Sequence, residues 1–321
     1  MRVGTVAPMT MSPQAAPFHV AAPAKINLHL RVGPPSADGF HPLLSWMVTV
    51  GLFDDLAFTP DSHPGLRLTC DDPAIPTDAS NLILKTAQAL LDAAPGKSPP
   101  GLSITLTKRI PTGAGLGGGS ADGAFTLLAL NRLLDLNWPA DRLAALAGRF
   151  GSDLPFFFHG PSSLCTGRGE VVRPTPPPKP RWALLILPGL HMATPAVYRR
   201  YDEMRLGDLV TLTDAPDWRH WATLDAKYLL PHLVNDLEAA AFSLSQPLAD
   251  LHARAADALA RTVRMSGSGS SLFTLYDDRA ETEIAAQRIR HLLGVRTECV
   301  ELCPTLREID TNGVGKFRIG E

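Results

Sequence analysis

A run of glycines between a strand-like segment and a helix-like segment constrains this chain more than any other feature. Five of the seven residues from Gly113 to Gly119 are glycine. Residues 102–107 alternate leucine or isoleucine with serine or threonine, which is typical of a half-buried strand. After Ser120, apolar residues recur at helical spacing. Because a glycine turn that opens a helix presents unpaired N–H groups and the positive end of the helix dipole, this segment predicts a phosphate site.

Two common phosphate-binding patterns fit this run poorly. Gly113-x-Gly115-x-x-Gly118 has the spacing of the dinucleotide fingerprint, so a nicotinamide-dependent oxidoreductase stays open as an alternative. That fingerprint follows a buried, almost wholly apolar parallel strand, whereas residues 102–107 carry a hydroxyl at every second position. The Walker A pattern is absent because no Gly-Lys-Ser/Thr follows. We therefore interpret the loop as a phosphate binder of a third type.

Length and charge narrow the class of protein. The 321 residues exceed what one hydrophobic core usually serves, so we expect two domains. Thirty basic residues against 32 acidic ones give a net charge of −2. This balance disfavours nucleic acids and anionic membrane surfaces as binding partners. No apolar run is long enough to span a bilayer. The four cysteines lack histidines at zinc-ligand spacing, so we expect free thiols and a cytoplasmic protein.

Composition suggests five consecutive segments. Residues 1–17, rich in Ala, Pro and Met, are expected to be a disordered extension, and residues 18–174 a first domain. Four prolines in residues 175–180 predict a stiff linker. Residues 181–303 read as strand, helix, two strands, helix and strand, which predicts a ferredoxin-like α/β sandwich. Residues 304–321 are expected to form a C-terminal tail.

Three local predictions bear on the fold. Residues 54–69 alternate apolar and polar side chains and are expected to form a hairpin. Residues 81–94 are expected to form an amphipathic helix, with Asp78 and Ser80 as possible caps. Residues 206–224 are polar and proline-interrupted, and are expected to be a loop.

Several polar residues stand in unusual surroundings. Lys25 follows small residues in a strand-like segment, and Asp153 lies beside three phenylalanines. Phe40-His41 begins another strand. Taken singly, these residues favour a solvated lysine, a helix cap, and a core aromatic residue beside an exposed imidazole. The Gly/Ser-rich turn of residues 265–271 is either a plain hairpin turn or a second lining of the phosphate cleft.

Taken together, the motifs resemble those of the GHMP kinases, the galacto-, homoserine, mevalonate and phosphomevalonate kinases. Three blocks in order carry this resemblance: Pro23–Leu28, Pro111–Asp122 and Ser266–Ser271. Further segments are similar to the branch that acts on a cytidine-diphosphate-linked methylerythritol: Ala37–His41, Gly151–Pro155 and Asn235–Glu238. The resemblance runs over nearly the whole chain, from about Val20 to Val300.

This resemblance implies an α+β fold of two domains. The N-terminal one would be a ribosomal-S5-domain-2-like ATP-binding domain and the C-terminal one a ferredoxin-like α/β sandwich, with the active site in the cleft between them. It implies ATP-dependent phosphorylation of the 2-hydroxyl of the methylerythritol portion, in non-mevalonate isoprenoid biosynthesis. ATP and Mg²⁺ are the expected cofactors, the partner is a small-molecule substrate, and the protein is expected to be a monomer or weak homodimer. Another GHMP kinase, acting on mevalonate, homoserine or a sugar, stays an alternative.

The resemblance also implies roles for single residues. Asp153 matches the catalytic base, and Lys25 matches the lysine beside it. Ser120 is in addition a candidate contact to Mg²⁺, for which no other ligand is predicted. The expected substrate-binding residues, with the aromatic ones stacking on cytosine, are Asn27, Phe40, His41, Thr194 and Tyr198. The expected ATP-binding residues are Asn81, Pro111, Thr112, Gly113, Ala114, Gly115, Leu116, Gly117, Gly118, Gly119, Ser120, Ala121, Gly267, Ser268 and Gly269.

Two residues depart from the pattern of this branch. Phe40 stands where the branch usually has tyrosine, which keeps a stacking ring but removes a hydroxyl. Asp122 replaces an expected asparagine. A carboxylate in the first turn of a helix is favoured by the helix dipole but lies close to the expected phosphates. We therefore do not assign Asp122 to nucleotide binding.

Overall fold

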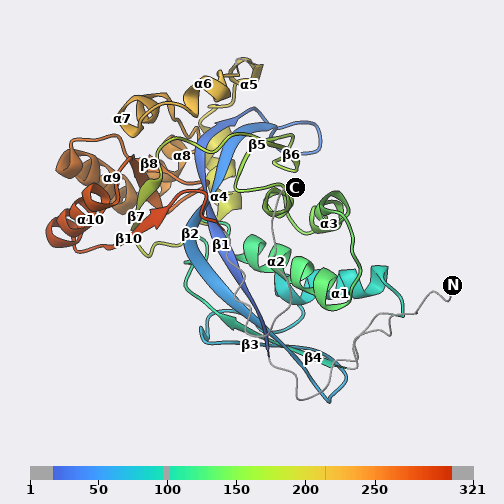
Figure 1. Cartoon of the computed structure of the whole chain (residues 1–321). Coiled ribbons are helices and arrows are strands. Elements are labelled where there is room, and N and C mark those ends of the chain that lie inside the picture. Colours follow the sequence, from blue (N-terminus) through green and yellow to red (C-terminus); the bar gives the residue numbers. More distant parts are fainter. Residues whose placement is uncertain (1–16, 97–100, 214, 306–321) are drawn as a thin grey trace.

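Two antiparallel strands form the spine of the protein. The computed structural model describes residues 17–96, 101–213 and 215–305 (Figure 1). In its first sheet the strand order is β3-β4-β2-β5-β6, and β1 pairs along the other edge of β2. The bounds are β1 (Phe18–Val32), β2 (Leu43–Pro60), β3 (Gly65–Cys70), β4 (Gly101–Thr107), β5 (Ser162–Thr166) and β6 (Val171–Pro174). Helices α1 (Leu82–Ala93), α2 (Gly118–Leu133) and α3 (Ala140–Ala147) and the 3₁₀ turn η1 (Pro155–Phe158) accompany this sheet.

The second half of the chain has the expected strand–helix order. Its sheet, β10-β7-β9-β8, is antiparallel at every pairing and contains β7 (Trp182–Leu187), β8 (Arg264–Met265), β9 (Leu272–Tyr276) and β10 (Arg296–Glu301). The longer helices of this half are α4 (Thr194–Glu203), α8 (Glu238–Leu244), α9 (Gln246–Leu259) and α10 (Arg279–Leu293). Short helical turns lie between them: α5 (Val210–Thr213), α6 (Trp218–Trp221), α7 (Ala226–Leu229) and η2 (Leu230–His232).

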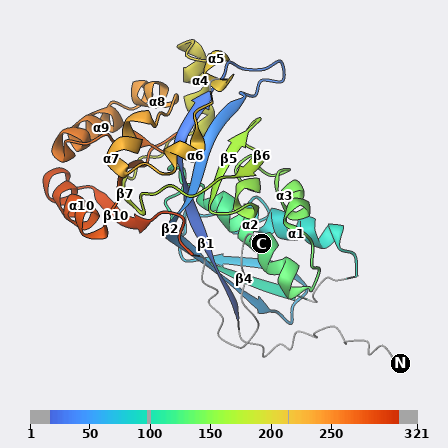
Figure 2. The ribbon, with the colours of Figure 1, turned by 45° about the horizontal axis from the view of Figure 1, so that its top comes forward.

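The β1–β2 pair is covered on both faces. Helices α1 to α3 lie on one side of it and the elements of the second half on the other, as Figures 1 and 2 show. Neighbouring side chains of β2 alternate between these sides: Met47 packs in the core under α1 to α3, whereas Trp46 and Val48 pack with Phe273 of β9. The two halves therefore share one core through β1 and β2. The exact domain boundaries and the linker at 175–180 stay predictions.

The predicted hairpin over residues 54–69 is wrong. β2 continues unbroken to Pro60, and β3 does not pair with it. Instead β4 lies between them, antiparallel to β2 through Phe58 and Ile104 and parallel to β3. Side-chain alternation identified both strands correctly, but it carries no information about which strand is the partner.

The predicted loop over residues 206–224 is also wrong in part, because it contains α5 and α6. The Asp217 side chain accepts a hydrogen bond from the His220 N–H and so caps α6. This turn buries Trp218 against Trp46, with ring centroids 5.9 Å apart. The polar composition of the segment concealed the buried Trp218 and Ala222.

Among the described helices, none is long and apolar enough to cross a membrane. The four cysteines are free thiols, as expected. The predicted N-terminal extension, apart from its last residue, and most of the predicted C-terminal tail lie outside the described residues.

The polar side chains of Asn27 and His29 on β1 are separated by a shift in register. Pairing with β2 shifts between Asn27 and His29, and a one-residue shift moves the following side chains to the opposite face. Asn27 therefore faces the cleft described below, whereas His29 is 2% exposed and packs edge-on against Trp218 and Trp221. Burial, together with the charge of Arg31, lowers the pKa of His29 to about 3.

This lowered pKa predicts a loss of stability in mild acid. The unfolded chain binds a proton at His29 below its ordinary pKa of 6.5, whereas the folded chain does not until about 3. Between these values the stability contributed by this group falls as the pH falls, by up to about 1.4 kcal/mol per pH unit. His29→Phe should flatten the pH dependence of urea-unfolding free energies between these values. His220→Phe, at an exposed position of α6, should leave it unchanged; equal slopes in His29→Phe and the parent protein would contradict this assignment.

Candidate active site

The two glycine-rich turns meet. The Ser271 N–H donates to the Ala114 carbonyl at 3.0 Å, and the Ser266 hydroxyl donates to the Gly115 carbonyl at 2.9 Å. Gly115 has φ +78°, and a side chain there would clash with the Ser266 carbonyl oxygen, so this approach requires glycine. The 265–271 turn therefore lines the same cleft as the first loop, which was one of its two predicted roles.

The first turn leaves the amino end of α2 open for an anion. Helix α2 begins at Gly118, and its N-cap Gly117 has φ +68° and provides no side-chain cap. The first N–H groups of α2 and its dipole thus remain available to an anion. A Cβ on Gly117 would lie 2.8 Å from Lys25 Cγ, so glycine here lets the Lys25 side chain pass beneath the loop.

Lys25 and Asp153 form an ion pair under this loop. Lys25 Nζ lies 3.1 Å from Asp153 Oδ2, and the two side chains are 4% and 34% exposed. The same ammonium donates to Asn27 Oδ1 at 2.7 Å. The Lys25 backbone N–H donates to the Leu116 carbonyl at 2.9 Å, which ties β1 to the glycine loop.

The amide of Asn27 is held in one orientation. Its Nδ2 donates to Ser45 Oγ at 2.8 Å, and Ser45 in turn donates to the His29 carbonyl. Asn27 Oδ1 therefore faces Lys25, because the amide nitrogen is already engaged on the other side. We expected Asn27 in the pocket of Phe40 and His41, but it lines the glycine-loop cavity beside Lys25.

Two cavities form one continuous cleft. The first, of about 300 Å³, is enclosed by the glycine loop, Lys25 and the Gly267–Ser268 turn. The second, of about 610 Å³, is lined by residues on the far side of Asp153, among them Phe40, His41 and Arg168. Residues that border both are Leu43, Ser120, Asp153, Thr194 and Tyr198. A phosphate donor in the first cavity and an acceptor in the second would therefore meet at Asp153.

The second cavity has aromatic walls and a fixed imidazole. His41 Nε2 lies 2.7 Å from Asp202 Oδ1, and the His41 and Tyr198 ring centroids are 4.9 Å apart. Phe40 is half exposed. Burial and the nearby charge of Asp153 raise the pKa of the Tyr198 phenol, which keeps it neutral. A planar heteroaromatic ring suits such walls.

Most, but not all, expected nucleotide-binding residues line the first cavity. The loop from Pro111 to Ser120 does so, together with Gly267 and Ser268, whose hydroxyl lies 2.8 Å from Thr194 Oγ1. Ala121 is fully buried in α2 and does not line the cavity.

Two further expected nucleotide contacts lie outside the cavity lining. Gly269 is packed against Met265. Asn81 is the N-cap of α1, in place of Asp78 or Ser80: its Oδ1 accepts from the Ile83 N–H, and its Nδ2 donates to the Pro76 carbonyl. The amide of Asn81 is thereby engaged in its own helix cap.

Asp122 points away from the cleft. It is buried and lies 3.0 Å from Lys108 Nζ, and Lys108 also pairs with the buried Asp54. Asp54 further accepts hydrogen bonds from the Arg109 and Ile110 N–H groups. Burial raises the pKa of Asp122, whose Oδ1 has no hydrogen-bond partner. Asp122 thus belongs to a charge cluster behind the loop and not to the phosphate-facing surface.

The segment Asn235–Glu238 braces the second glycine-rich turn, residues 265–271. Asn235 donates from Nδ2 to the Met265 and Gly267 carbonyls, both at 2.8 Å, and accepts from the Leu237 N–H. The Glu238 carboxylate accepts the Met265 N–H at 2.8 Å. An asparagine before a helix is typical of a cap, and nothing in the sequence pattern shows partners about thirty residues further on.

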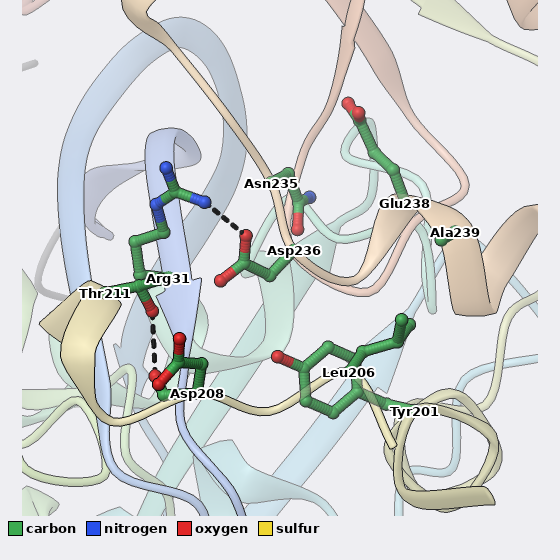
Figure 3. A pocket seen from close by; sticks show the side chains of 9 residues that line it. All are labelled: Arg31, Tyr201, Leu206, Asp208, Thr211, Asn235, Asp236, Glu238 and Ala239. Carbon is green, nitrogen blue, oxygen red and sulfur yellow. Dashed lines mark hydrogen bonds and ion pairs between the residues drawn. The ribbon is translucent and has the colours of Figure 1, made fainter. Parts of the chain in front are cut away.

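The next residue of this segment binds the end of β1. Asp236 accepts the Val32 N–H at 3.0 Å and pairs with Arg31 at 2.9 Å. Figure 3 shows this pair in a separate pocket of about 490 Å³, whose other walls include Tyr201 and Asp208. The Arg31–Asp236 pair and the Val32 N–H bond therefore tie the end of β1 to the segment that braces the second turn.

Comparisons with known proteins find relatives over most of the chain. The family models described as "GHMP kinases N terminal domain" and "GHMP kinases C terminal" match residues 81–161 and 213–293. A 4-diphosphocytidyl-2-C-methyl-D-erythritol kinase from Synechococcus sp. (strain CC9902) is 39% identical over 277 residues, covering 83% of this chain and 90% of that protein. The kinase of the same name from Nocardioides sp. is 40% identical, covering 77% and 84%.

Solved structures show the same relation. A crystal structure of 4-(cytidine 5'-diphospho)-2C-methyl-D-erythritol kinase is similar with a TM-score of 0.72 and 34% identity, covering 89% of this chain and 100% of that one. Homoserine kinase from Cytophaga hutchinsonii has a TM-score of 0.67 at 20% identity, covering 92% of this chain and 97% of its own. At that identity the second likeness shows the fold alone. The expected two-domain α+β fold is confirmed.

The brace at Asn235 yields a prediction. Asn235→Asp keeps the acceptor for the Leu237 N–H but removes the donors to two buried carbonyl groups. Each buried carbonyl left without a donor lowers the free energy of unfolding by about 1–3 kcal/mol. Thermal unfolding should show this loss, and titration with an ATP analogue should show weaker binding because the second turn is released. Gln287→Glu, which makes the same change from amide to carboxylate at an exposed position of α10, is the control and should change stability by less than about 0.5 kcal/mol. Unchanged stability and binding in Asn235→Asp would contradict the bracing role.

Proposed function

Because this chain belongs to the 4-diphosphocytidyl-2-C-methyl-D-erythritol kinases of the GHMP kinase family, we propose that it transfers the γ-phosphoryl group of ATP to the 2-hydroxyl of 4-diphosphocytidyl-2-C-methyl-D-erythritol. This reaction belongs to non-mevalonate isoprenoid biosynthesis. The observation that carries the proposal is the continuous cleft, with the glycine loop at one end, aromatic walls at the other and the Lys25–Asp153 pair where they join.

Asp153 is the proposed general base. Its carboxylate borders both cavities and is one-third exposed, so an acceptor hydroxyl can reach it. As the hydroxyl oxygen bonds to the γ-phosphorus, its proton passes to Asp153 and the bond from phosphorus to the bridging oxygen of ADP breaks. Positioning and charge neutralisation account for most of the catalysis of such transfers.

Lys25 supplies positive charge at the same point. Two of the three ammonium protons are directed to Asp153 and Asn27, which leaves one for the acceptor oxygen or the transferred phosphoryl group. Because the ammonium is buried, its field is screened little by water. Lys25 thus orients Asp153 and stabilises the negative charge that develops during transfer.

The residues of the cleft fit a metal that arrives with the nucleotide. Within the described part of the chain, no group of three or more His, Cys, Asp or Glu side chains forms a metal cage. Mg²⁺ commonly binds through substrate phosphates, waters and one or two protein oxygens, and Ser120 and Asp153 border the cavity for such contacts. When bound, Mg²⁺ would neutralise phosphate charge.

The second cavity suits the cytidine end of the acceptor. Phe40 and Tyr198 offer ring faces for stacking, and Thr194 lies at the junction with the phosphate cavity. Asp202 fixes the orientation of the His41 ring, so that an imidazole nitrogen can hydrogen-bond to the base edge.

One assay tests the substrate directly. ADP release should be measured side by side with cytidine-diphospho-methylerythritol, mevalonate and homoserine. We expect turnover with the first alone; no turnover with it would end the proposal, and preference for another alcohol would support the broader GHMP alternative.

The nicotinamide alternative conflicts with the family assignment and with β4, whose Thr105 side is exposed. NAD(H) titration should accordingly show no fluorescence change.

Replacing Asp153 with asparagine tests its role as the base. Asp153→Asn keeps the shape of the side chain but cannot accept the proton, so kcat should fall by at least about 10²-fold. Affinity for ATP, measured by titration, should be largely kept because the loop supplies the phosphate contacts. Asp141→Asn, on the exposed face of α3, should retain full activity. Turnover near the parent value in Asp153→Asn would remove this residue from the role of base.

A further inference from the structure

The turn between β5 and β6 reaches the wall of the second cavity. The Leu43 N–H donates to the Gly167 carbonyl at 2.8 Å, which joins this turn to the start of β2. Gly169 lies against Ser152, the neighbour of Asp153, and a Cβ there would be 3.4 Å from Ser152 Cβ. The residue between these glycines, Arg168, is thus presented to the cavity by a turn that is anchored on two sides of the active site.

Arg168 lies on the ring of Phe40. Its guanidinium carbon is 3.9 Å from the Phe40 ring centroid, and the guanidinium forms an ion pair with Asp38. Asp38 Oδ1 also accepts the Phe40 N–H at 3.0 Å. One carboxylate therefore holds both the backbone of Phe40 and the cation that covers its ring.

This arrangement favours a stacking role over a phosphate contact. The Phe40 N–H and the Arg168 guanidinium keep the pKa of Asp38 below its ordinary value, so the carboxylate is ionised at neutral pH and neutralises the guanidinium. Phe40 is 51% exposed and its side chain has no polar atom by which to fix the ring. The Arg168 contact is thus an interaction that can hold the ring ready for a ligand, and preorganisation of this kind improves affinity.

We propose that Arg168 is a positioning residue for pyrimidine recognition: paired with Asp38, it holds the Phe40 ring as a stacking platform for the base of the acceptor nucleotide. The inference rests on the proposed function, because it takes the second cavity to be the site of the cytidine. It predicts that Arg168 acts on the base through Phe40 and not on the phosphates.

The test compares a ligand with phosphates and one without. Competitive inhibition of the kinase reaction is measured with cytidine and with cytidine diphosphate, for the parent protein, Arg168→Ala, Arg168→Lys and Asp38→Asn. Loss of an exposed cation–π contact predicts that the inhibition constants of both ligands, and the KM of the acceptor, rise about two- to fivefold. Because Lys lacks the planar face, Arg168→Lys should not restore them fully. The kcat and the KM for ATP should stay within about twofold.

A double-mutant cycle with Phe40→Ala tests the route of the effect. In the Phe40→Ala background, Arg168→Ala should cause no further change in cytidine inhibition, because the platform is already gone. Arg142→Ala is the matched control: its guanidinium lies 3.4 Å from the Trp138 ring centroid, outside the cleft, and its loss should leave all constants unchanged.

Four results would overturn the inference. A rise for cytidine diphosphate without one for cytidine would make Arg168 a phosphate contact, and additive effects in the Phe40→Ala background would separate Arg168 from the ring. If cytidine inhibits the parent protein and the inhibition constants are unchanged in Arg168→Ala, the inference is rejected but the proposed function is not. A parent protein that neither turns over the acceptor nor responds to cytidine would reject the proposed function together with it.

Discussion

The active site depends on one buried ammonium group. Taking a lysine charge out of water costs several kcal/mol unless it is paired and hydrogen-bonded, and Lys25 meets this requirement with Asp153 and Asn27. Each partner is held by a different part of the chain. Asn27 is oriented by Ser45 on β2, whereas Asp153 precedes the η1 turn. The pairing of β1 with β2 and its cover on both faces therefore fix this ion pair at the border of the two cavities.

A second set of buried charges supports the loop from behind. Lys108 lies between Asp54 and Asp122 near the start of α2. Its ammonium group therefore pairs with these two side chains and does not face the cleft. The proposed phosphate-binding surface is instead built from backbone N–H groups, the helix dipole and Lys25. Glycine is required there for two separate reasons: at Gly115 by the opposing carbonyl, and at Gly117 by the Lys25 side chain.

The sequence predicted what local patterns encode. The glycine loop, its helix and the second Gly/Ser turn follow from composition and spacing, and the structure brings them together. Strand partners and long-range side-chain contacts do not follow from such patterns. For that reason β3 was paired wrongly and Asn235 had no role, whereas the cap of α1 was misplaced by one to three residues, because Asp78, Ser80 and Asn81 are all good capping residues. The position of Asp122 depends on Lys108 and Asp54, which lie outside its own helix.

The account is tested most directly by a crystal structure with a non-hydrolysable ATP analogue and cytidine diphosphate bound together. It predicts the triphosphate on the glycine loop, with the γ-phosphate directed toward Asp153 and Lys25, and the cytosine ring between the Phe40 and Tyr198 walls. Cytidine diphosphate bound outside this cavity, or a γ-phosphate directed away from Asp153, would contradict it.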